Sequence, residues 1–271
     1  MNDERTVRWM SIHPQETFLV KRLDELIEKA AQGAFRLSFF VDPRGRALAR
    51  ARARSQGVSV FAYGGYEGAE RARLLFAPED AVGETSSWYE NRETMALGFV
   101  KIHVKEGSIT HRQVLGAILS LGVKREMLGD IVLPLQANCA ILVTSDALAP
   151  FIADHLQSID RASVRAEVVT HVSPECFDHA VRGDVRVLFT SSLRLDGVLK
   201  DALHLSRERA KLLIQKGAVR VSFRPVDAPD FPVAPGDILS VRGYGRIYID
   251  EVVGQSKKGR YRLHVRLLLD P

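Results

Sequence analysis

The chain has little of what secreted and membrane proteins contain. It holds only two cysteines in 271 residues, Cys139 and Cys176, and two cysteines far apart in sequence fit no disulfide framework. Its first residues lack the basic and then apolar pattern of a signal peptide. No apolar run reaches the roughly 18 residues that a membrane span requires. We therefore expect no disulfide, no export and no membrane insertion, and a cytoplasmic location.

Residues 1–190 have almost equal numbers of basic and acidic side chains. Residues 191–271 hold 15 Lys and Arg against 9 Asp and Glu, whereas residues 1–190 hold 23 against 24. The basic excess is thus confined to the C-terminal third, as expected if one module binds nucleic acid. Hydrophobic residues make up 46% of the chain and charged residues 26%, which is typical of a folded protein, and the length predicts two or three domains.

Hydrophobic spacing predicts an α+β protein and divides residues 1–182 into two domains. Residues 1–82 have helical spacing over 14–31 and 44–54 and strand-like runs at 35–41, 58–63 and 71–76, which predicts a small α/β domain. A polar stretch, 83–92, follows as a linker. Residues 83–182 then show the order strand, helix, strand, strand, helix, strand, at 99–104, 110–121, 130–133, 140–143, 146–159 and 164–169. This order predicts a ferredoxin-like (split βαβ) domain of the type that many RNA-recognition modules share.

Base stacking on this second domain is not favoured by its sequence. RNA-recognition modules stack bases on aromatic side chains of their central strands. The expected central strand 140–144 reads Ala-Ile-Leu-Val-Thr and has no aromatic residue. We therefore expect the RNA contacts elsewhere.

Residues 190–271 show two short helices followed by strands. Leu195, Val198 and Leu199 begin an apolar stripe, which predicts a first helix that ends near residue 203. Ser206 is a favourable N-cap for a second helix over 207–215, and Gly217 is a favourable helix stop. Strands are expected at 219–221, 238–242, 247–249 and 260–267, with a Pro-rich loop after the first.

The spacing of several motifs in this region resembles the S4 family of RNA-binding domains over about 60 residues. The segments that carry the resemblance are Arg194-Leu195-Asp196, Ser206-Arg207, Gly217 with Val219 and Val221, Gly236-Asp237 and Arg242-Gly243-Tyr244-Gly245-Arg246. Ser222 is a departure, because many members carry Asn there. The resemblance implies a C-terminal S4 domain that binds structured RNA.

Cations are the candidate RNA contacts, since guanidinium and ammonium groups bind phosphate and release counterions. In the S4 region they are Arg194, Lys200, Arg207, Arg209, Lys211, Lys216, Arg220, Arg242 and Arg246. Each alone is also compatible with a solvated surface charge. The last predicted strand places Arg260, Arg262, His264 and Arg266 on one face, so Arg262 and Arg266 extend the RNA surface or form an ordinary polar face.

The whole chain resembles the YlmH family of bacterial S4-domain proteins. The segments are Phe39-Phe40-Val41-Asp42-Pro43-Arg44, Gly64-Gly65-Tyr66, Ala69-Glu70-Arg71, Thr110-His111-Arg112, Leu115-Gly116-Ala117, Leu121-Gly122-Val123-Lys124-Arg125-Glu126 and Gly129-Asp130-Ile131. The resemblance implies binding to the large ribosomal subunit carrying a stranded peptidyl-tRNA, in the rescue pathway that extends stalled chains with alanine. We expect a non-catalytic monomer. Its implied partners are rRNA, tRNA and other ribosome-rescue factors. His111, Arg112, Lys124 and Arg125 either contact RNA or solvate a helix and a loop.

Two rival functions use the same S4 module. One is a pseudouridine synthase, which needs an Arg-Leu-Asp triplet followed by a Thr/Gly-rich turn, and Arg194-Leu195-Asp196 lacks that turn. The other is an rRNA chaperone or assembly factor. A cell-division or photosynthetic-repair role also stays open.

Other candidate chemistry is weak. His171, Cys176 and His179 have no standard zinc spacing, and Gly243-Tyr244-Gly245 precedes a strand, which favours a β-turn over a nucleotide loop. We expect no catalytic residue, metal site or cofactor.

Overall fold

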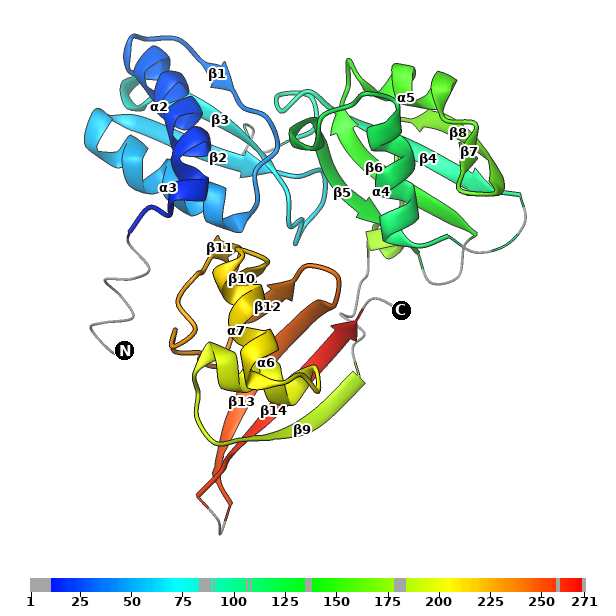
Figure 1. The fold of residues 1–271 in the computed structure, drawn as a ribbon. Coiled ribbons are helices and arrows are strands. Elements are labelled where there is room, and N and C mark those ends of the chain that lie inside the picture. The colour runs from blue at the N-terminus through cyan, green and yellow to red at the C-terminus, as the bar shows by residue number, and fades with distance from the viewer. Residues whose placement is uncertain are drawn as a thin grey trace. The chain divides into compact units, whose positions relative to one another are not determined.

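The computed structural model describes residues 11–82, 89, 91–105, 107, 109–134, 138–177, 184–256 and 259–269. They form a mixed α+β protein with three antiparallel sheets (Figure 1). The chain divides into two compact units: Leu19–Ala180, here the N-terminal unit, and Met1–Phe18 with Val181–Pro271, here the C-terminal unit. Among the described residues, no helix is long and apolar enough to cross a membrane.

The first sheet of the N-terminal unit has the strand order β1-β3-β2. Its strands are β1 (Arg36–Leu37), β2 (Val58–Tyr63) and β3 (Arg73–Pro78), and its helices are α2 (Thr17–Ala31), which follows the 3-10 turn η1 (Pro14–Glu16), and α3 (Pro43–Ala53). The helices pack on the sheet through a core that includes Leu23, Ile27 and Phe76. Asp42 caps α3 by accepting from the Gly45 N–H at 2.8 Å, as its place before Pro43 favours.

The strand predicted over residues 35–41 is wrong for most of its length. Only Arg36 and Leu37 pair with β3, and Val41 forms an isolated bridge to Ala72. The Phe40 N–H instead donates to the Glu126 carbonyl at 2.8 Å. The segment leaves regular pairing with β3 after Leu37, because Phe40 bonds to Glu126 in a 3-10 turn (Arg125–Met127) that lies far away in the sequence.

The second sheet of this unit has the order β5-β6-β4-β8-β7. Its strands are β4 (Leu97–Val104), β5 (Leu128–Val132), β6 (Cys139–Ser145), β7 (Ser158–Ile159) and β8 (Ala162–Val169), and its helices are α4 (His111–Ser120) and α5 (Ala149–His155). Thr110 caps α4 in a capping box with Gln113. The predicted helix over 146–159 is too long, since residues 158–159 form β7. That strand pairs with β8 through a turn at Asp160, whose φ of +52° Asp tolerates.

The two sheets share one apolar cluster. Phe40 and Leu75 from the first sheet region pack with Phe99, Ile141 and Val143 of the second, and Phe99 is only 5% exposed. The sheet face on which RNA-recognition modules stack bases is therefore buried here around Phe99. This burial agrees with the expectation that bases do not stack on it.

A polar joint adds to that cluster. The Asp130 carboxylate accepts from the Tyr66 hydroxyl at 2.7 Å and from the backbone N–H groups of Glu70 and Arg71 at 2.7 and 3.0 Å. The Arg71 guanidinium donates to the carbonyls of Leu128 and Phe40 at 2.9 and 2.8 Å. Burial, with Asp130 close by, raises the pKa of the Tyr66 hydroxyl, so it stays a proton donor. Asp130 thus ties the two sheets into one unit.

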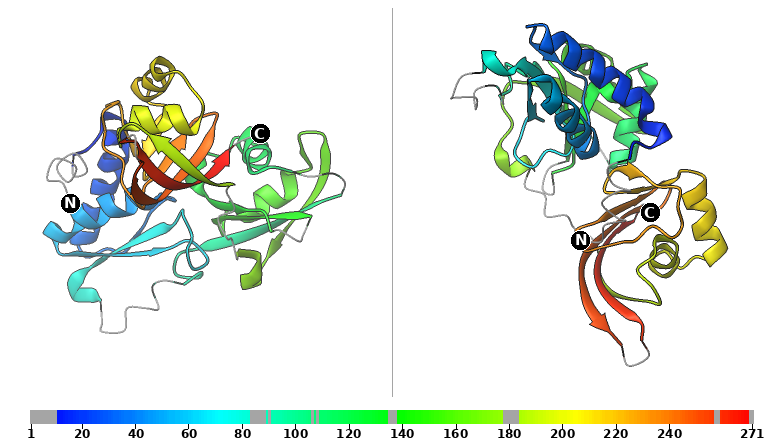
Figure 2. Two further views of the ribbon diagram at one scale, coloured as in Figure 1. Left: turned by 90° about the horizontal axis from the view of Figure 1, so that it is seen from below. Right: turned by 90° about the vertical axis from the view of Figure 1, so that its left-hand side faces the viewer.

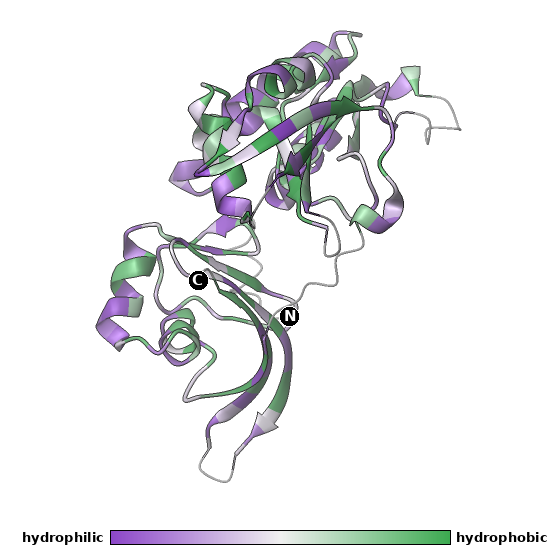
Figure 3. Cartoon of the chain, turned by 90° about the vertical axis from the view of Figure 1, so that its right-hand side faces the viewer, coloured by the Kyte–Doolittle hydropathy of each residue, from purple (hydrophilic) through white to green (hydrophobic). Residues whose placement is uncertain are grey.

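The C-terminal unit holds a six-stranded sheet of order β11-β10-β12-β13-β14-β9. The strands are β9 (Asp184–Thr190), β10 (Val219–Val221), β11 (Arg224–Pro225), β12 (Ile238–Val241), β13 (Gly245–Gln255) and β14 (Tyr261–Leu269). Helices α6 (Leu195–Ala202) and α7 (Arg207–Gln215) lie on one face of the sheet (Figure 2). Leu199, Ile214 and Ile247 belong to the core between them. Hydrophobic and hydrophilic residues both occur along these strands (Figure 3), as in a sheet with one buried face.

The ends of α7 lie at the predicted residues. Ser206 accepts from the Arg209 N–H at 3.1 Å, and Gly217 follows the helix at a φ of +66°. Ser222 and Phe223, which connect β10 to β11, also have positive φ values of 46° and 70°. Asn adopts such a φ more easily than Ser, which is a physical reason for the Asn that many members of the S4 family carry there. Here the Ser222 hydroxyl instead donates to the Asp237 carboxylate at 3.2 Å and accepts from the Ile238 N–H at 3.3 Å.

Two strands of this sheet were missed by the sequence analysis. No strand was predicted over β9, most of which lies between the predicted domains 83–182 and 190–271, and β11 lies in the predicted Pro-rich loop. β9 pairs with β14 from Thr190↔Tyr261 to Asp184↔Leu267. Its burial does not alternate, because most of its side chains are exposed on an edge strand, so the usual period of two is weak.

Candidate nucleic-acid interface

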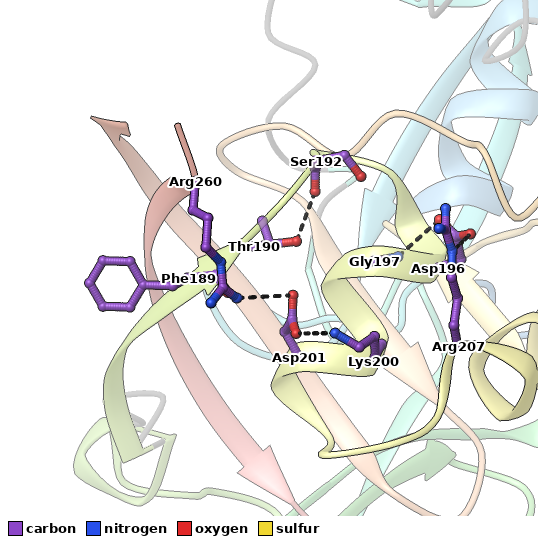
Figure 4. A network of polar contacts seen from close by, with 9 residues as sticks. All are labelled: Phe189, Thr190, Ser192, Asp196, Gly197, Lys200, Asp201, Arg207 and Arg260. Carbon is purple, nitrogen blue, oxygen red and sulfur yellow. Dashed lines mark hydrogen bonds and ion pairs between the residues drawn. The ribbon is translucent and has the colours of Figure 1, made fainter. Parts of the chain in front are cut away.

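A buried carboxylate organises the start of both helices in the C-terminal unit. Asp196 lies in the first turn of α6 and its side chain is 0% exposed. Its two oxygens accept separately from the Nε atoms of Arg194 and Arg207, each at 3.2 Å. Figure 4 shows Arg207 reaching this carboxylate from the second helix. Each arginine contacts Asp196 through Nε and is about half exposed, so its two terminal nitrogens are not used by this carboxylate and can bind a phosphate.

The charge state of Asp196 follows from this geometry. Burial alone raises the pKa of a carboxyl, but the hydrogen bonds from Arg194 and Arg207 outweigh it and lower the pKa of Asp196 below its usual value. A carboxyl with a lowered pKa stabilises the folded state above its unfolded pKa of about 3.9 and loses that contribution as pH falls through the folded pKa.

We expect this pH dependence to be visible in Asp196→Asn. The difference in free energy of unfolding between the wild type and this variant should stay constant from pH 7 to about 5 and shrink at lower pH. Urea denaturation at a series of pH values measures it. A difference that stays unchanged down to pH of about 3 would contradict the ion-pair assignment.

Four further cations of α7 and the β12–β13 turn have no partner in the part of the chain that the structure describes. Among the described residues, the side chains of Arg209, Lys211, Lys216 and Arg242 make no hydrogen bond or ion pair. The Arg242 N–H donates to the Ala218 carbonyl at 2.9 Å, which places the β12–β13 turn beside the end of α7. With Arg194 and Arg207 these four are the candidate cations of α6, α7 and the β12–β13 turn, and we call this set the helical surface. A cation without an intramolecular partner breaks no ion pair when it binds phosphate, so these are the strongest candidates.

Lys200 differs from that group. Its ammonium lies 2.9 Å from Asp201, and Arg260 lies 3.9 Å from the same carboxylate (Figure 4). The local charge is therefore partly neutralised, and Lys200 is a weaker candidate than the helical surface.

The remaining predicted cations of this unit lie on the other face of the sheet. Val219, Val221 and Ile247 point into the core, so the alternating residues Arg220 and Arg246 point away from it. Arg262 and Arg266 alternate with buried residues of β14 in the same way. The structure thus separates Arg220 and Arg246 from the predicted cations on α6 and α7, which spacing alone did not reveal.

The predicted contacts in the N-terminal unit are of two kinds. His111, Arg112 and Lys124 are exposed. Arg125 instead donates to the carbonyls of Leu128 and Gly129 at 3.0 and 3.3 Å, and burial, with Arg71 nearby, lowers its pKa to about 10. These contacts favour a structural role for Arg125.

The geometry does not favour a pseudouridine synthase, a metal site or a nucleotide loop in the described parts of the chain. The Asp196 side chain is buried in α6, whereas the catalytic Asp of a pseudouridine synthase must contact the nucleotide that it modifies. In the parts of the chain that the structure describes, no group of three His, Cys, Asp or Glu could hold a metal, and His179 of the suspected cluster lies outside those parts. Gly243 and Tyr244 lie in a turn closed by Tyr244 N–H to the Val241 carbonyl at 3.0 Å, so the β-turn prediction is confirmed.

The fold and the helical surface together define an S4-domain RNA-binding protein, and comparisons with known proteins agree. Residues 193–239 match the "S4 domain" family, and residues 92–172 match the family described as "Putative RNA-binding domain in YlmH". The chain is 33% identical to "Ribosome-associated protein quality control protein P2" of Bacillus subtilis over 234 residues, which are 86% of this chain and 87% of that protein. It belongs to the YlmH family of RNA-binding proteins.

A solved structure is also similar. It is that of "Cell division protein ylmH from Streptococcus pneumoniae", with a TM-score of 0.49 and 20% identity. The similarity covers 59% of this chain and 94% of that one.

Proposed function

We propose that this protein binds the large ribosomal subunit carrying a peptidyl-tRNA and takes part in the rescue of stalled chains by alanine extension. The helical surface carries the proposal, because it combines two arginines held by Asp196 with four cations that have no partner in the described part of the chain. Its targets are rRNA and tRNA, and other rescue factors bind alongside it. The protein is a cytoplasmic monomer that catalyses no reaction.

We also propose that residues 83–182 are a ferredoxin-like domain and residues 1–82 a separate α/β domain joined to it. The strand order β5-β6-β4-β8, with α4 and α5 on one face, fits the first assignment. Because we do not expect bases to stack on the sheet face opposite α4 and α5, we propose that these two domains recognise the shape of the ribosome or tRNA. His111, Arg112 and Lys124 are exposed candidates for contacts to that RNA.

The experiment is sedimentation of the purified protein with large subunits, with and without peptidyl-tRNA, over a series of salt concentrations. Arg209→Gln with Lys211→Gln should weaken binding about tenfold and reduce the slope of log affinity against log salt by roughly 1.5. The control is Lys21→Gln with Arg50→Gln, which removes the same charge from exposed positions on α2 and α3.

Three outcomes separate the proposals. The rescue function is supported if the protein prefers subunits that carry peptidyl-tRNA, if the Arg209→Gln and Lys211→Gln double variant loses this preference, and if the control double variant keeps it. Equal loss in both variants would mean that only overall charge matters. Binding to free RNA without binding to subunits would favour the chaperone function, and nucleotide-resolved crosslinking would then locate its contacts.

A further inference from the structure

The sheet of the C-terminal unit has an exposed second face, opposite α6 and α7. We call it the outer sheet face and define it by its residues on β10, β13, β14 and β9: Arg220, Arg246, Tyr248, Arg262, His264, Arg266, Leu268, Val185, Val187 and Phe189. The S4 match covers residues 193–239, so β9, β13 and β14 lie outside it.

Large apolar side chains are exposed along one edge of this face. Val185 is 77% exposed, Val187 49% and Phe189 42%. Figure 4 shows the Phe189 ring directed away from α6. Exposed side chains of this size in a row are uncommon on a surface that binds nothing.

Each of these apolar residues has a basic neighbour on the adjacent strand. The cross-strand pairs are Phe189↔Arg262, Val187↔His264 and Val185↔Arg266. Alternate residues of a strand are about 6.6 Å apart, so the basic side chains form a regular row beside the apolar one. An extended RNA strand presents the same combination, a line of phosphates beside a line of base faces.

The basic residues of this face differ in whether they form an ion pair with a nearby carboxylate. Arg266 is bound to Asp250 through Nε and Nη at 2.8 to 3.0 Å, and His264 lies 3.7 Å from Glu251. Arg262 is exposed and, among the described residues, has no hydrogen bond or ion pair. The outer sheet face carries four arginines against Asp250 and Glu251, so it is net positive. Arg262 beside Phe189 is its most available cation.

We propose that the outer sheet face is a second RNA site, for unpaired nucleotides, in which Phe189 stacks on a base and Arg262 binds the neighbouring phosphate. Unpaired RNA fits better than a duplex, because base faces are hidden in a duplex. It also fits better than a protein, because the apolar row is a single side chain wide and has an arginine beside each of its ends, Arg262 and Arg266. This site does not depend on the ribosomal function proposed above.

The test measures binding of a fluorescent unstructured oligoribonucleotide and of a blunt RNA hairpin to the full chain. Phe189→Ala and Arg262→Gln should each weaken oligonucleotide binding about tenfold and leave hairpin binding unchanged. Phe189→Leu should weaken it as well, since it keeps an apolar side chain but removes the ring. The control is Leu269→Ala, which removes a side chain that is also 42% exposed but lies outside the outer sheet face, and it should bind like the wild type.

Unchanged oligonucleotide binding in Phe189→Ala and Arg262→Gln, with melting temperatures like that of the wild type, would overturn the proposal. If those variants bind the oligonucleotide normally but lose binding to large subunits, the face binds a ribosomal component other than unpaired RNA, and the proposal is equally overturned. Failure of the rescue function would look different, since oligonucleotide binding would persist while preference for peptidyl-tRNA was absent.

Discussion

Asp130→Ala is expected to lower the free energy of unfolding of the N-terminal unit by about 3 kcal/mol. The substitution removes the acceptor of three hydrogen bonds, two from the backbone of Glu70 and Arg71 and one from the Tyr66 hydroxyl. A partly buried N–H without a partner costs its full desolvation. The nearby guanidiniums of Arg46 and Arg125 also lose a favourable negative charge.

The measurement is the melting temperature of the N-terminal unit, which should fall by roughly 10 °C, because about 1 kcal/mol corresponds to 2–4 °C for a unit of this size. Tyr66→Phe is the matched variant, since it removes one of the three hydrogen bonds and should cost about 1 kcal/mol. If Asp130→Ala unfolds at the same temperature as Tyr66→Phe, the backbone contacts of Asp130 contribute nothing.

Asp196→Ala should lower the free energy of unfolding of the C-terminal unit by about 2 kcal/mol. It removes the carboxylate that holds Arg194 and Arg207 at 3.2 Å each. The cost stays below the 3–5 kcal/mol typical of breaking a buried ion pair, because both arginines are about half exposed and water can solvate them again. A negative charge favourable to the N-terminal end of α6 is lost as well.

Hydrogen exchange of the amides in α6 and α7 measures this effect within the C-terminal unit. Glu208→Ala is the control, since Glu208 is an exposed carboxylate in the first turn of α7 and should change stability by less than about 0.5 kcal/mol. Equal exchange rates in the two variants would mean that Asp196 does not fix the helix ends.

The limits of prediction from the sequence are visible in α7 and β9. The residues of α7 were predicted correctly, because Ser206 and Gly217 act on backbone groups within one turn. β9 was missed, because an edge strand with both faces largely exposed shows no alternation and is defined only by its pairing with β14. Helix 146–159 was predicted too long for the same reason, since β7 exists only through its pairing with β8.

The sequence by itself determined the α+β class, the S4 domain, the family and the set of cations that could bind RNA. It could do so because caps, helical periodicity and motif spacing are local properties. Only the tertiary structure decided that Asp196 holds Arg194 and Arg207, that Phe99 is buried, and that Arg220, Arg246 and Arg262 lie on the face opposite α6 and α7. These facts depend on residues brought together from distant parts of the chain, and no short stretch of sequence contains them.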